Sequence, residues 1–312
     1  MKVLVTGASG FIGRRLCVFL KEKGHEVIAA VRDESKVIDF TQCIIVGCID
    51  NNTNWAPALE NVDAVIHLAG RAHIIIEHSK NPLSEFLAAN AYPTKKLAND
   101  SIKAGIKKFI FVSSIGVNGA VTFGTPFKES DAARPHSPYT VSKLKAENIL
   151  EDLFKDSLPD LIILRPPLIY GIDAPGNARL ISNMLKYNIP FPFRAVSNKR
   201  SFLAVDNLLS ILDLCLTHPM AINKTILPSD GFDLSTKEFI EIIGIINGKK
   251  PFIFSIYPWI IDLFLQLIGK KKMSESLLCD LQVNSQYLFD HLEWVPVFNV
   301  KTQLKQLNKK EY

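Results

Sequence analysis

Tyr139 and Lys143 are the two residues of this sequence whose types and spacing have the plainest chemical use. They stand four positions apart in the segment Y-T-V-S-K after Pro138, so a helix places both on one face. An ammonium group beside a phenol favours the phenolate and lowers the pKa of the phenol. Ser113 and Ser114 end an apolar run, where a hydroxyl can hold a substrate carbonyl. These residues predict proton transfer at an oxygen atom, with Tyr139 as the acid or base.

A glycine-rich turn near the start of the chain predicts a dinucleotide site. Residues 3–13 read VLVTGASGFIG, which is a strand, a turn and then a helix. Gly7 permits the tight turn, Gly10 lets backbone amides approach a pyrophosphate, and Gly13 lets the helix pack closely on the sheet. The N-terminus of that helix then faces the anion. The strand and helix around the glycines make this prediction more specific than the glycine spacing alone.

The residue after the second strand discriminates between two dinucleotides. The strand expected over 26–31 ends without an acidic residue and continues with Arg32, a cation suited to the 2′-phosphate of NADP(H). In the alternative interpretation Arg32 is solvated and Asp33 binds the ribose of NAD(H). The sequence favours NADP(H) and leaves NAD(H) open.

Apolar runs and helix-period segments alternate through the first 165 residues and must position these groups. The runs at 2–6, 26–31, 43–46, 63–67, 108–113 and 161–165 are apolar throughout, as strands covered by helices on both faces are. The segments 82–104 and 138–153 are long enough to be crossover helices. The predicted fold class is α/β, with a Rossmann-type doubly wound parallel sheet.

The pattern changes after Pro166 and Pro167. Short apolar pieces at 189–193, 225–227 and 294–297 are separated by proline, asparagine and aspartate, which predicts a smaller, irregular α+β lobe. We therefore divide the chain into a dinucleotide-binding domain, 1–167, and a substrate lobe, 168–312, between which the chain can cross. A ligand is expected in the cleft between them.

Composition excludes several classes of protein. The chain has 312 residues and a net charge of +5, and its lysines and arginines are scattered, so no nucleic-acid footprint is expected. The five cysteines include no C-x-x-C pair and predict reduced thiols in a cytoplasmic protein. His73 and His78 lack partners at a metal-binding spacing, so no metal site is predicted.

The apolar segment 252–268, which runs into Lys270, Lys271 and Lys272, allows two interpretations. Pro258 interrupts it, and Asp262 and Gln266 recur on one face, so no integral membrane span is predicted. We favour a helix packed on the second lobe, and weak contact with a membrane surface is the alternative.

Five motifs in order make the chain resemble the extended short-chain dehydrogenase/reductase family, which contains the NAD-dependent sugar epimerases and dehydratases. They are TGASGFIG from Thr6, DAVIHLAG from Asp63, FVSSIGVNG from Phe111, YTVSK from Tyr139 and LRPPLIYG from Leu164, and the resemblance covers nearly the whole chain. It implies that Ser114 and Tyr139 are catalytic, that Lys143 binds the nicotinamide ribose and tunes Tyr139, and that Asn90 helps to position the lysine. His67 is expected to be structural, with its ring near the cofactor loop.

The glycine turn, the loops at the carboxyl edge of the sheet and the catalytic helix together give the predicted cofactor contacts. These are Gly7, Ser9, Gly10, Phe11, Ile12, Gly13, Arg32, Ile49, Asp50, Leu68, Ala69, Gly70, Asn90, Ser113, Tyr139, Lys143, Pro166 and Leu168.

The second lobe matches the same family at its substrate segment. KRSFLAVDNL, from Lys199, is similar to the family segment whose arginine binds the diphosphate of a nucleotide sugar, which implies that role for Arg200. Asn177 resembles the asparagine that meets the same diphosphate, and Phe191 or Phe193 lies where the family places its uracil pocket. With Ser114 and Asn118 these are the predicted substrate contacts. A homodimer is expected from the resemblance, with the helix after Pro138 contributing to it.

Departures from the family pattern narrow the expected reaction. Dehydratases follow their catalytic hydroxyl residue with Asp-Glu, whereas this chain has Ile115 and Gly116, so dehydration is not expected. Asn118 and Thr140 also depart from the common pattern, and the chain looks most like the branch acting on UDP-N-acetylhexosamines in surface-polysaccharide assembly. The resemblance therefore implies NAD(P)H-dependent reduction of the C4 ketone of a UDP-4-keto-6-deoxy-N-acetylhexosamine. The alternatives are UDP-hexose 4-epimerisation, which Arg32 disfavours, and a non-enzymatic cofactor sensor.

Overall fold

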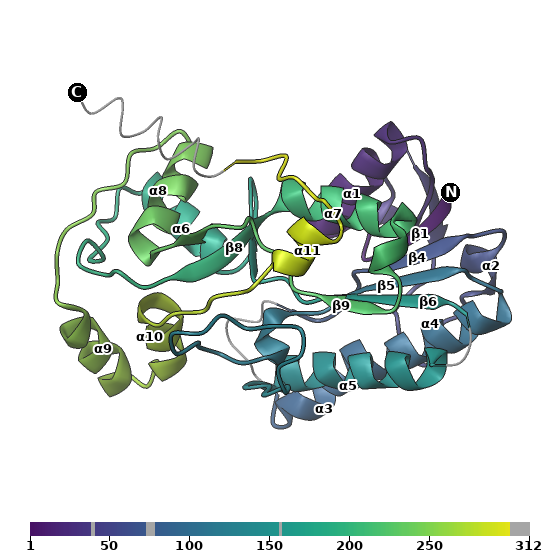
Figure 1. The fold of residues 1–312 in the computed structure, drawn as a ribbon, viewed down its shortest axis with the longest axis horizontal. Helices are drawn as coiled ribbons and strands as arrows, with labels where there is room; N and C mark the ends of the chain where they lie inside the picture. Colours follow the sequence, from purple (N-terminus) through teal and green to yellow (C-terminus); the bar gives the residue numbers. More distant parts are fainter. Residues whose placement is uncertain (39–40, 73–78, 156–157, 300–312) are drawn as a thin grey trace.

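A parallel sheet forms the centre of the protein in the computed structural model, which describes residues 1–38, 41–72, 79–155 and 158–299. Within these residues the sheet has seven strands in the order β3-β2-β1-β4-β5-β6-β9, and each neighbouring pair is parallel (Figure 1). The strands are β1 (Lys2–Thr6), β2 (Glu26–Val31), β3 (Gln42–Ile45), β4 (Ala64–His67), β5 (Lys108–Val112), β6 (Asp160–Leu164) and β9 (Lys224–Ile226). The predicted Rossmann-type α/β fold is confirmed.

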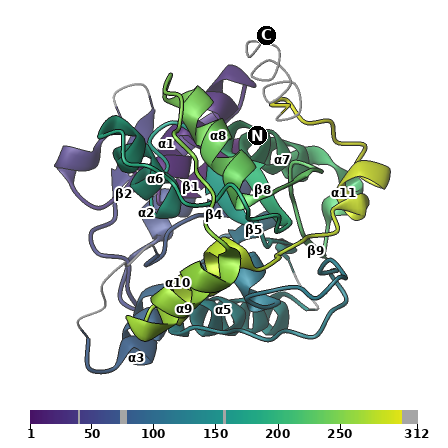
Figure 2. The ribbon, with the colours of Figure 1, turned by 90° about the vertical axis from the view of Figure 1, so that its left-hand side faces the viewer.

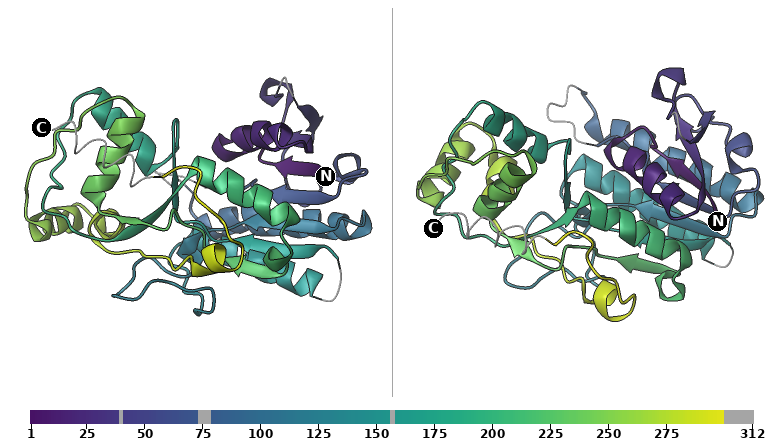
Figure 3. Two further views of the ribbon diagram at one scale, coloured as in Figure 1. Left: turned by 45° about the horizontal axis from the view of Figure 1, so that its top comes forward. Right: turned by 90° about the horizontal axis from the view of Figure 1, so that it is seen from above.

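Helices cover both faces of this sheet. The helices α1 (Phe11–Glu22) and α7 (Val205–Thr217) pack on one face, and α2 (Ala56–Leu59), α4 (Tyr92–Lys103) and α5 (Pro138–Phe154) pack on the other (Figure 3). Along β1, Val3 and Val5 belong to the first apolar core, and Leu4 belongs to the second. Both faces of the central strands are therefore buried, which explains why these strands carry no alternation of apolar and polar residues.

The strand order places a crevice at a defined edge of the sheet. The chain winds outward from β1 through β2 to β3, and then returns to the other side of β1 with β4. The loops that leave β1 and β4 consequently diverge at their carboxyl ends. Open α/β sheets bind their ligands at such a reversal point.

The second lobe is built around a small three-stranded sheet. Its strands are β10 (Asp233–Leu234), β8 (Arg200–Ala204) and β7 (Leu168–Tyr170), where β7 and β8 are parallel and β10 is antiparallel. Tyr170, Phe202 and Phe239 form part of its apolar core, and the rings of Phe202 and Phe239 stack 4.1 Å apart. Its helices are α6 (Asn177–Lys186), α8 (Thr236–Ile246), α9 (Pro258–Leu267) and α10 (Lys271–Leu278) (Figure 2).

After residue 167 the chain enters the second lobe, and it later returns to the first domain. Residues 225–227 are expected in the irregular lobe, but Thr225 and Ile226 belong to β9 and extend the main sheet beside β6, so this sequence prediction is wrong. The reason is that β9 pairs with the edge of β6, whose backbone groups need partners. Helix α7 packs on α1, and Leu288 of α11 (Gln286–Asp290) lies in the same core. A division at residue 167 marks only the first crossing.

The segment 82–104 is not one continuous helix. It forms α3 (Pro82–Phe86), a π-helical turn over Leu87–Ala91 and then α4. Pro93 has no amide hydrogen and cannot donate within the helical ladder, which accounts for the irregular turn just before it. The π turn brings Asn90 to face α5, as described below.

Candidate active site

The glycine turn after β1 leaves space that any other residue would fill. Gly7 has φ +68°, and a Cβ on it would lie 2.8 Å from the amide nitrogen of Ala69. A Cβ on Gly13 would lie 2.2 Å from the carbonyl oxygen of Gly7, so α1 could not pack as it does. Helix α1 begins without a side-chain cap and without an acidic residue in its first turn. Its first amides are thus free of a competing carboxylate, which suits a pyrophosphate.

One cavity of about 640 Å³ joins the glycine turn to the predicted catalytic residues. It lies at the crevice between the loops that follow β1, β4 and β5. The predicted residues that line it are Gly7, Gly10, Phe11, Ile12, Gly13, Leu68, Gly70, Ser113, Ser114, Tyr139, Lys143, Pro166, Leu168 and Asn177. Residues from both lobes therefore meet at one place, although they are far apart in the sequence.

Lys143 is held inside this site by the end of β5. Its Nζ donates a hydrogen bond of 2.9 Å to the carbonyl oxygen of Val112, and it lies 4.5 Å from the centre of the Phe111 ring. Burial lowers the pKa of Lys143 to about 8, while Glu147, one turn along α5, acts in the opposite direction. The ammonium is positioned but poorly solvated, which strengthens its interaction with any negative charge nearby.

Tyr139 lines the same cavity and packs edge-on against Phe86, with ring centres 6.0 Å apart. Burial raises the pKa of Tyr139 to about 12. The expectation that Lys143 lowers this pKa below its ordinary value is wrong for this arrangement. The physical reason is that the phenol loses solvation, and the ammonium of Lys143 is directed to Val112 instead.

The two serines after β5 have different surroundings. Ser114 Oγ accepts a hydrogen bond of 3.2 Å from the amide of Gly116, so its own hydrogen remains available to donate toward the cavity. Ser113 is buried, and its Oγ has no hydrogen-bond partner within the described residues. A buried hydroxyl without a partner costs free energy unless a bound group satisfies it. The glycine turn and this hydroxyl together fit a bound dinucleotide.

A chain of hydrogen bonds connects the glycine turn to Asn90. The amide of Ala69 donates to Thr6 Oγ1, which lies 2.6 Å from His67 Nδ1, and His67 Nε2 lies 2.9 Å from Thr94 Oγ1. Thr94 donates in turn to the carbonyl oxygen of Asn90, so His67 must donate through Nε2 and accept through Nδ1. Burial lowers the pKa of His67 to about 3, which keeps the ring neutral. The prediction that His67 is structural is confirmed.

Asn90 ties three backbone segments together without lining the cavity. Its Oδ1 accepts a 2.6 Å hydrogen bond from the amide of Arg71, and its Nδ2 donates to the carbonyl oxygen of Arg71 and to Ser142 Oγ. Ser142 lies next to Lys143 on α5. Asn90 thereby fixes the helix that carries the lysine relative to the loop after β4, and its direct contact with a cofactor stays a prediction.

Replacing Lys143 by methionine should stabilise the fold while it removes activity. The folded-state pKa of about 8 lies below the ordinary lysine value of 10.5, so keeping the ammonium buried opposes folding below pH 8. We expect K143M to gain on the order of 2 kcal/mol at pH 7, less than the shift alone implies because the bond to Val112 is lost. Stability of the unmodified protein rises between pH 8 and 10.5 as the folded state releases this proton first, so the advantage of the variant should shrink across that interval.

Urea unfolding of the protein without added ligand at pH 7 and pH 10 measures this difference. Lys145, exposed on the same helix, gives the matched control K145M, which should change stability by less than about 0.5 kcal/mol at both pH values. A K143M protein that is less stable than the parent at pH 7 contradicts the prediction.

Three predicted substrate contacts lie in packed regions. Asn118 is buried, accepts a 3.0 Å hydrogen bond from Arg165 and donates to the carbonyl oxygen of Lys128, so its amide is used inside the protein. Phe191 and Phe193 belong to the apolar core of the second lobe, and Phe191 is 1% exposed. Their contact with substrate stays a prediction, and in this packing Asn118 and Phe191 present little surface to a ligand.

Arg200 also has a structural use in this arrangement. Its guanidinium donates to the carbonyl oxygens of Glu275 and Cys279 and so closes the C-terminal end of α10. It does not line the cavity. Asn177, in contrast, lies at the start of α6 on the cavity lining, where it remains a predicted substrate contact.

Six predicted cofactor residues lie outside the lining of this cavity, namely Asn90, described above, and Ser9, Arg32, Ile49, Asp50 and Ala69. Arg32 is exposed just after β2, and the neighbouring Asp33 accepts hydrogen bonds from the amide and hydroxyl of Ser35. Asp33 is therefore already engaged as the cap of a short 3₁₀ turn, Glu34–Lys36.

The sequence analysis missed two parts of the cavity. Arg71 follows Gly70 on the lining, pairs with Glu85 at 2.9 Å and lies over the Phe86 ring. The second part is Pro175 and Gly176, which precede α6. Arg71 could have been predicted from its position directly after the L-A-G turn. No pattern in the sequence marked Pro175 and Gly176.

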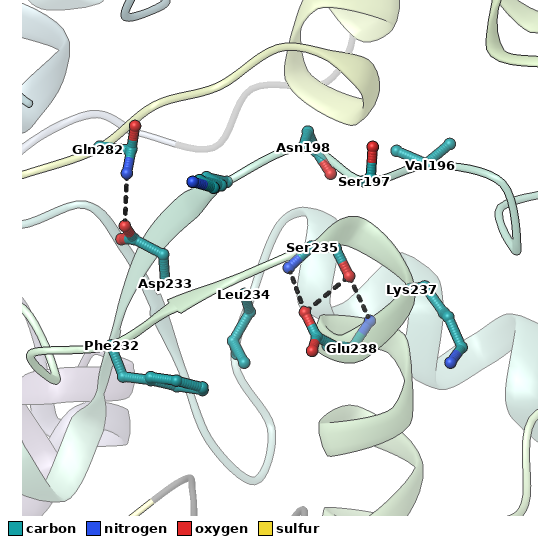
Figure 4. A pocket seen from close by; sticks show the side chains of 11 residues that line it. Val196, Ser197, Asn198, Phe232, Asp233, Leu234, Ser235, Lys237, Glu238 and Gln282 are labelled. Carbon is teal, nitrogen blue, oxygen red and sulfur yellow. Dashed lines mark hydrogen bonds between the residues drawn. The ribbon is translucent and has the colours of Figure 1, made fainter. Parts of the chain in front are cut away.

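A second hollow of about 530 Å³ lies in the C-terminal lobe beside the start of α8 (Figure 4). Its polar groups bond to one another: Gln282 donates to Asp233, and Ser235 and Glu238 form a reciprocal cap (Figure 4). No group of three potential metal ligands occurs among the described residues. His73 and His78 lie outside the described residues. The cavity at the glycine turn is consequently the better candidate site.

Comparison with known proteins agrees with this assignment. Residues 3–227 match the NAD dependent epimerase/dehydratase family. The chain is 34% identical over 306 residues to a UDP-glucose 4-epimerase of Vibrio cholerae, which covers 97% of this chain and 93% of that protein. It is 27% identical over 292 residues, 88% of this chain and 83% of the other, to an N-acetyl-alpha-D-glucosaminyl-diphospho-ditrans,octacis-undecaprenol 4-epimerase of Escherichia coli O157:H7.

Solved structures share the fold over the full length. The UDP-glucuronic acid 4-epimerase of Bacillus cereus, in complex with UDP-glucuronic acid and NAD, matches with a TM-score of 0.75, 24% identity and complete coverage of both chains. The family match agrees with the cavity that joins the glycine turn to Ser114, Tyr139 and Lys143. This chain belongs to the NAD-dependent epimerase/dehydratase family and is an enzyme of the extended short-chain dehydrogenase/reductase type.

Proposed function

We propose that this protein is a UDP-hexose or UDP-N-acetylhexosamine 4-epimerase that uses bound NAD. The observation that carries the proposal is that Ser114, Tyr139 and Lys143 line one cavity with the glycine turn. The full-length similarity to a UDP-glucose 4-epimerase supports 4-epimerisation over the reduction favoured by sequence.

The protein's own residues have separable tasks in this reaction. Tyr139 removes the proton from the sugar 4-hydroxyl and later returns it, and Ser114 donates a hydrogen bond that orients the same oxygen. Lys143, which the carbonyl oxygen of Val112 holds in place, binds the nicotinamide ribose in this proposal. The chemistry that the dinucleotide supplies when bound is reversible uptake of a hydride from carbon. Pro166, Pro167 and Leu168 help to exclude water from this part of the cavity.

The residues after Ser114 support epimerisation over dehydration. Ile115 is buried beside Leu227, Leu281 and Val283, in an apolar cluster that cannot accommodate a carboxylate. A Cβ on Gly116 would lie 2.5 Å from a methyl group of Thr140 and 3.2 Å from His136. Two acidic residues could not replace this pair without rearranging the loop, so positions 115 and 116 supply neither an acid nor a base for the elimination of water.

One observation favours a second candidate function, reduction of a UDP-4-keto-6-deoxy-N-acetylhexosamine. Arg32 is exposed after β2, and the adjacent carboxylate of Asp33 is occupied by Ser35. This arrangement favours the 2′-phosphate of NADP(H), and an exchangeable NADPH suits a reductase.

Incubation of the purified protein with UDP-glucose and UDP-N-acetylglucosamine, without added cofactor, distinguishes 4-epimerisation from reduction. Appearance of the C4 epimer by proton NMR, together with NAD⁺ released on denaturation, supports the proposal. Stoichiometric oxidation of NADPH with a UDP-4-keto sugar, and no epimer from either UDP-sugar, overturns it. An undecaprenyl-diphosphate sugar belongs in the same assay, because the Escherichia coli relative is named for a substrate of that kind.

The setting of the enzyme is part of this proposal. We expect a cytoplasmic homodimer that takes part in surface-polysaccharide synthesis and contacts its partner copy through α4 and α5, which pack side by side on one face of the sheet (Figure 1). All five cysteines are unpaired, as in a reducing compartment. Sedimentation analysis of the purified protein tests the dimer.

A further inference from the structure

Helix α9 presents an apolar face to the outside of the protein. Its exposed residues include Trp259, 65% exposed, Phe264, 60% exposed, and Leu267, 77% exposed. Leu263 is exposed between them, so positions 259, 263, 264 and 267 share one face of the helix. Soluble proteins seldom leave a contiguous apolar surface of this kind uncovered without a use for it.

The opposite face of α9 explains how the helix is attached. Ile261 and Leu265, four residues apart, are buried in the core of the second lobe. Asp262 is bonded to Gln266 and to the hydroxyl of Ser274 on α10, so its carboxylate is turned to the neighbouring helix. The interpretation that the segment 252–268 packs on the second lobe is thus correct for Ile253, Ile261 and Leu265, and it leaves the larger, outer face of α9 unexplained. This helix forms one end of the molecule, beside α10 (Figure 2).

A basic cluster lies at the end of this helix. Lys270, Lys271 and Lys272 are consecutive and exposed. The carboxylates of the same two helices offset it only in part, because Asp262, which interacts electrostatically with Lys271, and the partly buried Glu275 are two carboxylates against three lysines. An apolar face that contains tryptophan and phenylalanine, next to lysines, is the pattern of a helix that lies in the interface of an anionic bilayer.

We propose that the outer face of α9, with Lys270–Lys272, docks the enzyme on an anionic phospholipid bilayer. Trp259, Leu263, Phe264 and Leu267 enter the boundary between headgroups and acyl chains, and the three lysines contact anionic headgroups. The helix has ten residues, so it lies on the surface. No helix of the described residues is long and apolar enough to cross a membrane.

A second copy of this chain fits the face less well than a bilayer. Two copies joined through α9 would bring six lysines to one contact, and the carboxylates of Asp262 and Glu275 would balance only part of their charge. An anionic lipid surface supplies both the apolar layer and the opposite charge.

The docked orientation would place the bilayer close to the cavity. Helix α10 packs on α9, and Ser276 of α10 lies 3.5 Å from Asn177 on the cavity lining. The docking face itself contains no residue of the cavity. Binding to lipid should thus be separable from catalysis.

The protein carries its own probe for the experiment. It has three tryptophans, of which Trp55 and Trp294 are buried and Trp259 is exposed. Vesicles of phosphatidylcholine with phosphatidylglycerol should shift the fluorescence of Trp259 to shorter wavelength and sediment with the protein. We expect binding to weaken at least about tenfold on vesicles of phosphatidylcholine alone, and by a similar factor in the double variant F264S/L267S.

Matched controls make the result specific to this face. Phe123, 89% exposed elsewhere on the protein, gives F123S, which should bind like the parent. Replacing Lys270, Lys271 and Lys272 by glutamine should weaken binding, whereas the same change at the exposed Lys95, Lys103 and Lys155 should weaken it less. Turnover of a water-soluble nucleotide sugar should be unchanged in F264S/L267S.

Three results overturn the proposal. They are the absence of a fluorescence shift with anionic vesicles, equal loss of binding in F123S and F264S/L267S, and self-association of the lipid-free protein that F264S/L267S abolishes. The last result would assign the face to a second copy of the chain. Because lipid binding is measured without substrate, failure of this proposal leaves the proposed epimerase activity untouched.

Discussion

The variant Y139F should lose turnover by a factor of about 10³ while it keeps its affinity for the cofactor. The phenol oxygen is the only atom removed, and the ring can keep its contact with Phe86. If Tyr139 moves the proton of the sugar hydroxyl, kcat must fall while KM changes little. Epimer formation measured by NMR gives kcat, and titration with NAD⁺ or NADP⁺ gives the cofactor affinity.

Tyr187, which is exposed on the second lobe, provides the matched control, and Y187F should keep full activity. The variant S114A should lose a smaller factor, about 10², because Ser114 donates a hydrogen bond to the reacting oxygen without taking its proton. If Y139F retains more than a tenth of the parent kcat, Tyr139 is not the proton carrier, and the proposed mechanism is wrong.

The parts of the site that sequence predicted correctly are those in which local sequence determines local geometry. Gly7 and Gly13 have roles that depend on backbone atoms only a few residues away. Tyr139 and Lys143 are fixed by the pitch of one helix, which begins at Pro138 with a Ser137 cap. The parallel sheet then brings the ends of its strands to one edge. Such features need no knowledge of how distant segments pack.

The second lobe was predicted less well because its residues acquire their roles through long-range packing. Phe191 could line a pocket or fill a core, and only its pairing with the segment around Ile253 decides for the core. Arg200 likewise closes α10, which begins seventy residues later. The expectation for Thr225 failed for the same reason, since β9 finds its partner in β6. Apolar periodicity carries no information about such partners.

The pKa of Tyr139 shows a related limit of sequence reasoning. The spacing of Tyr139 and Lys143 predicts that both side chains share a helix face, which is correct. It does not predict that Lys143 donates to Val112 or how deeply the phenol is buried, and these determine the direction of the shift. The spacing along the helix therefore predicted that Tyr139 and Lys143 share a face, but it did not predict the direction in which the pKa of Tyr139 is shifted.

The largest stability effect should follow from breaking the buried pair of Arg165 and Glu147. The guanidinium donates to both carboxylate oxygens of Glu147, at 2.6 Å for the shortest contact, and Glu147 is fully buried. Arg165 also donates to Asn118, which in turn donates to the carbonyl oxygen of Lys128. The pair therefore links the end of β6, α5 and the loop that contains Ser114. R165M leaves a buried carboxylate without its partner and should cost about 3 to 5 kcal/mol in urea unfolding.

The double variant R165M/E147L separates the interaction from the simple loss of a side chain. With both charges removed, the apolar replacements should recover most of the stability that R165M loses, because no unpaired charge stays buried. The exposed pair of Lys107 and Asp63 is the control, and K107A should cost less than about 1 kcal/mol. If R165M alone unfolds within 1 kcal/mol of the parent, the pair does not hold the loop. If instead the double variant is stable but inactive, the pair is needed for the geometry of the site rather than for folding, through the bond of Arg165 to Asn118 or through the charge of Glu147 near Lys143.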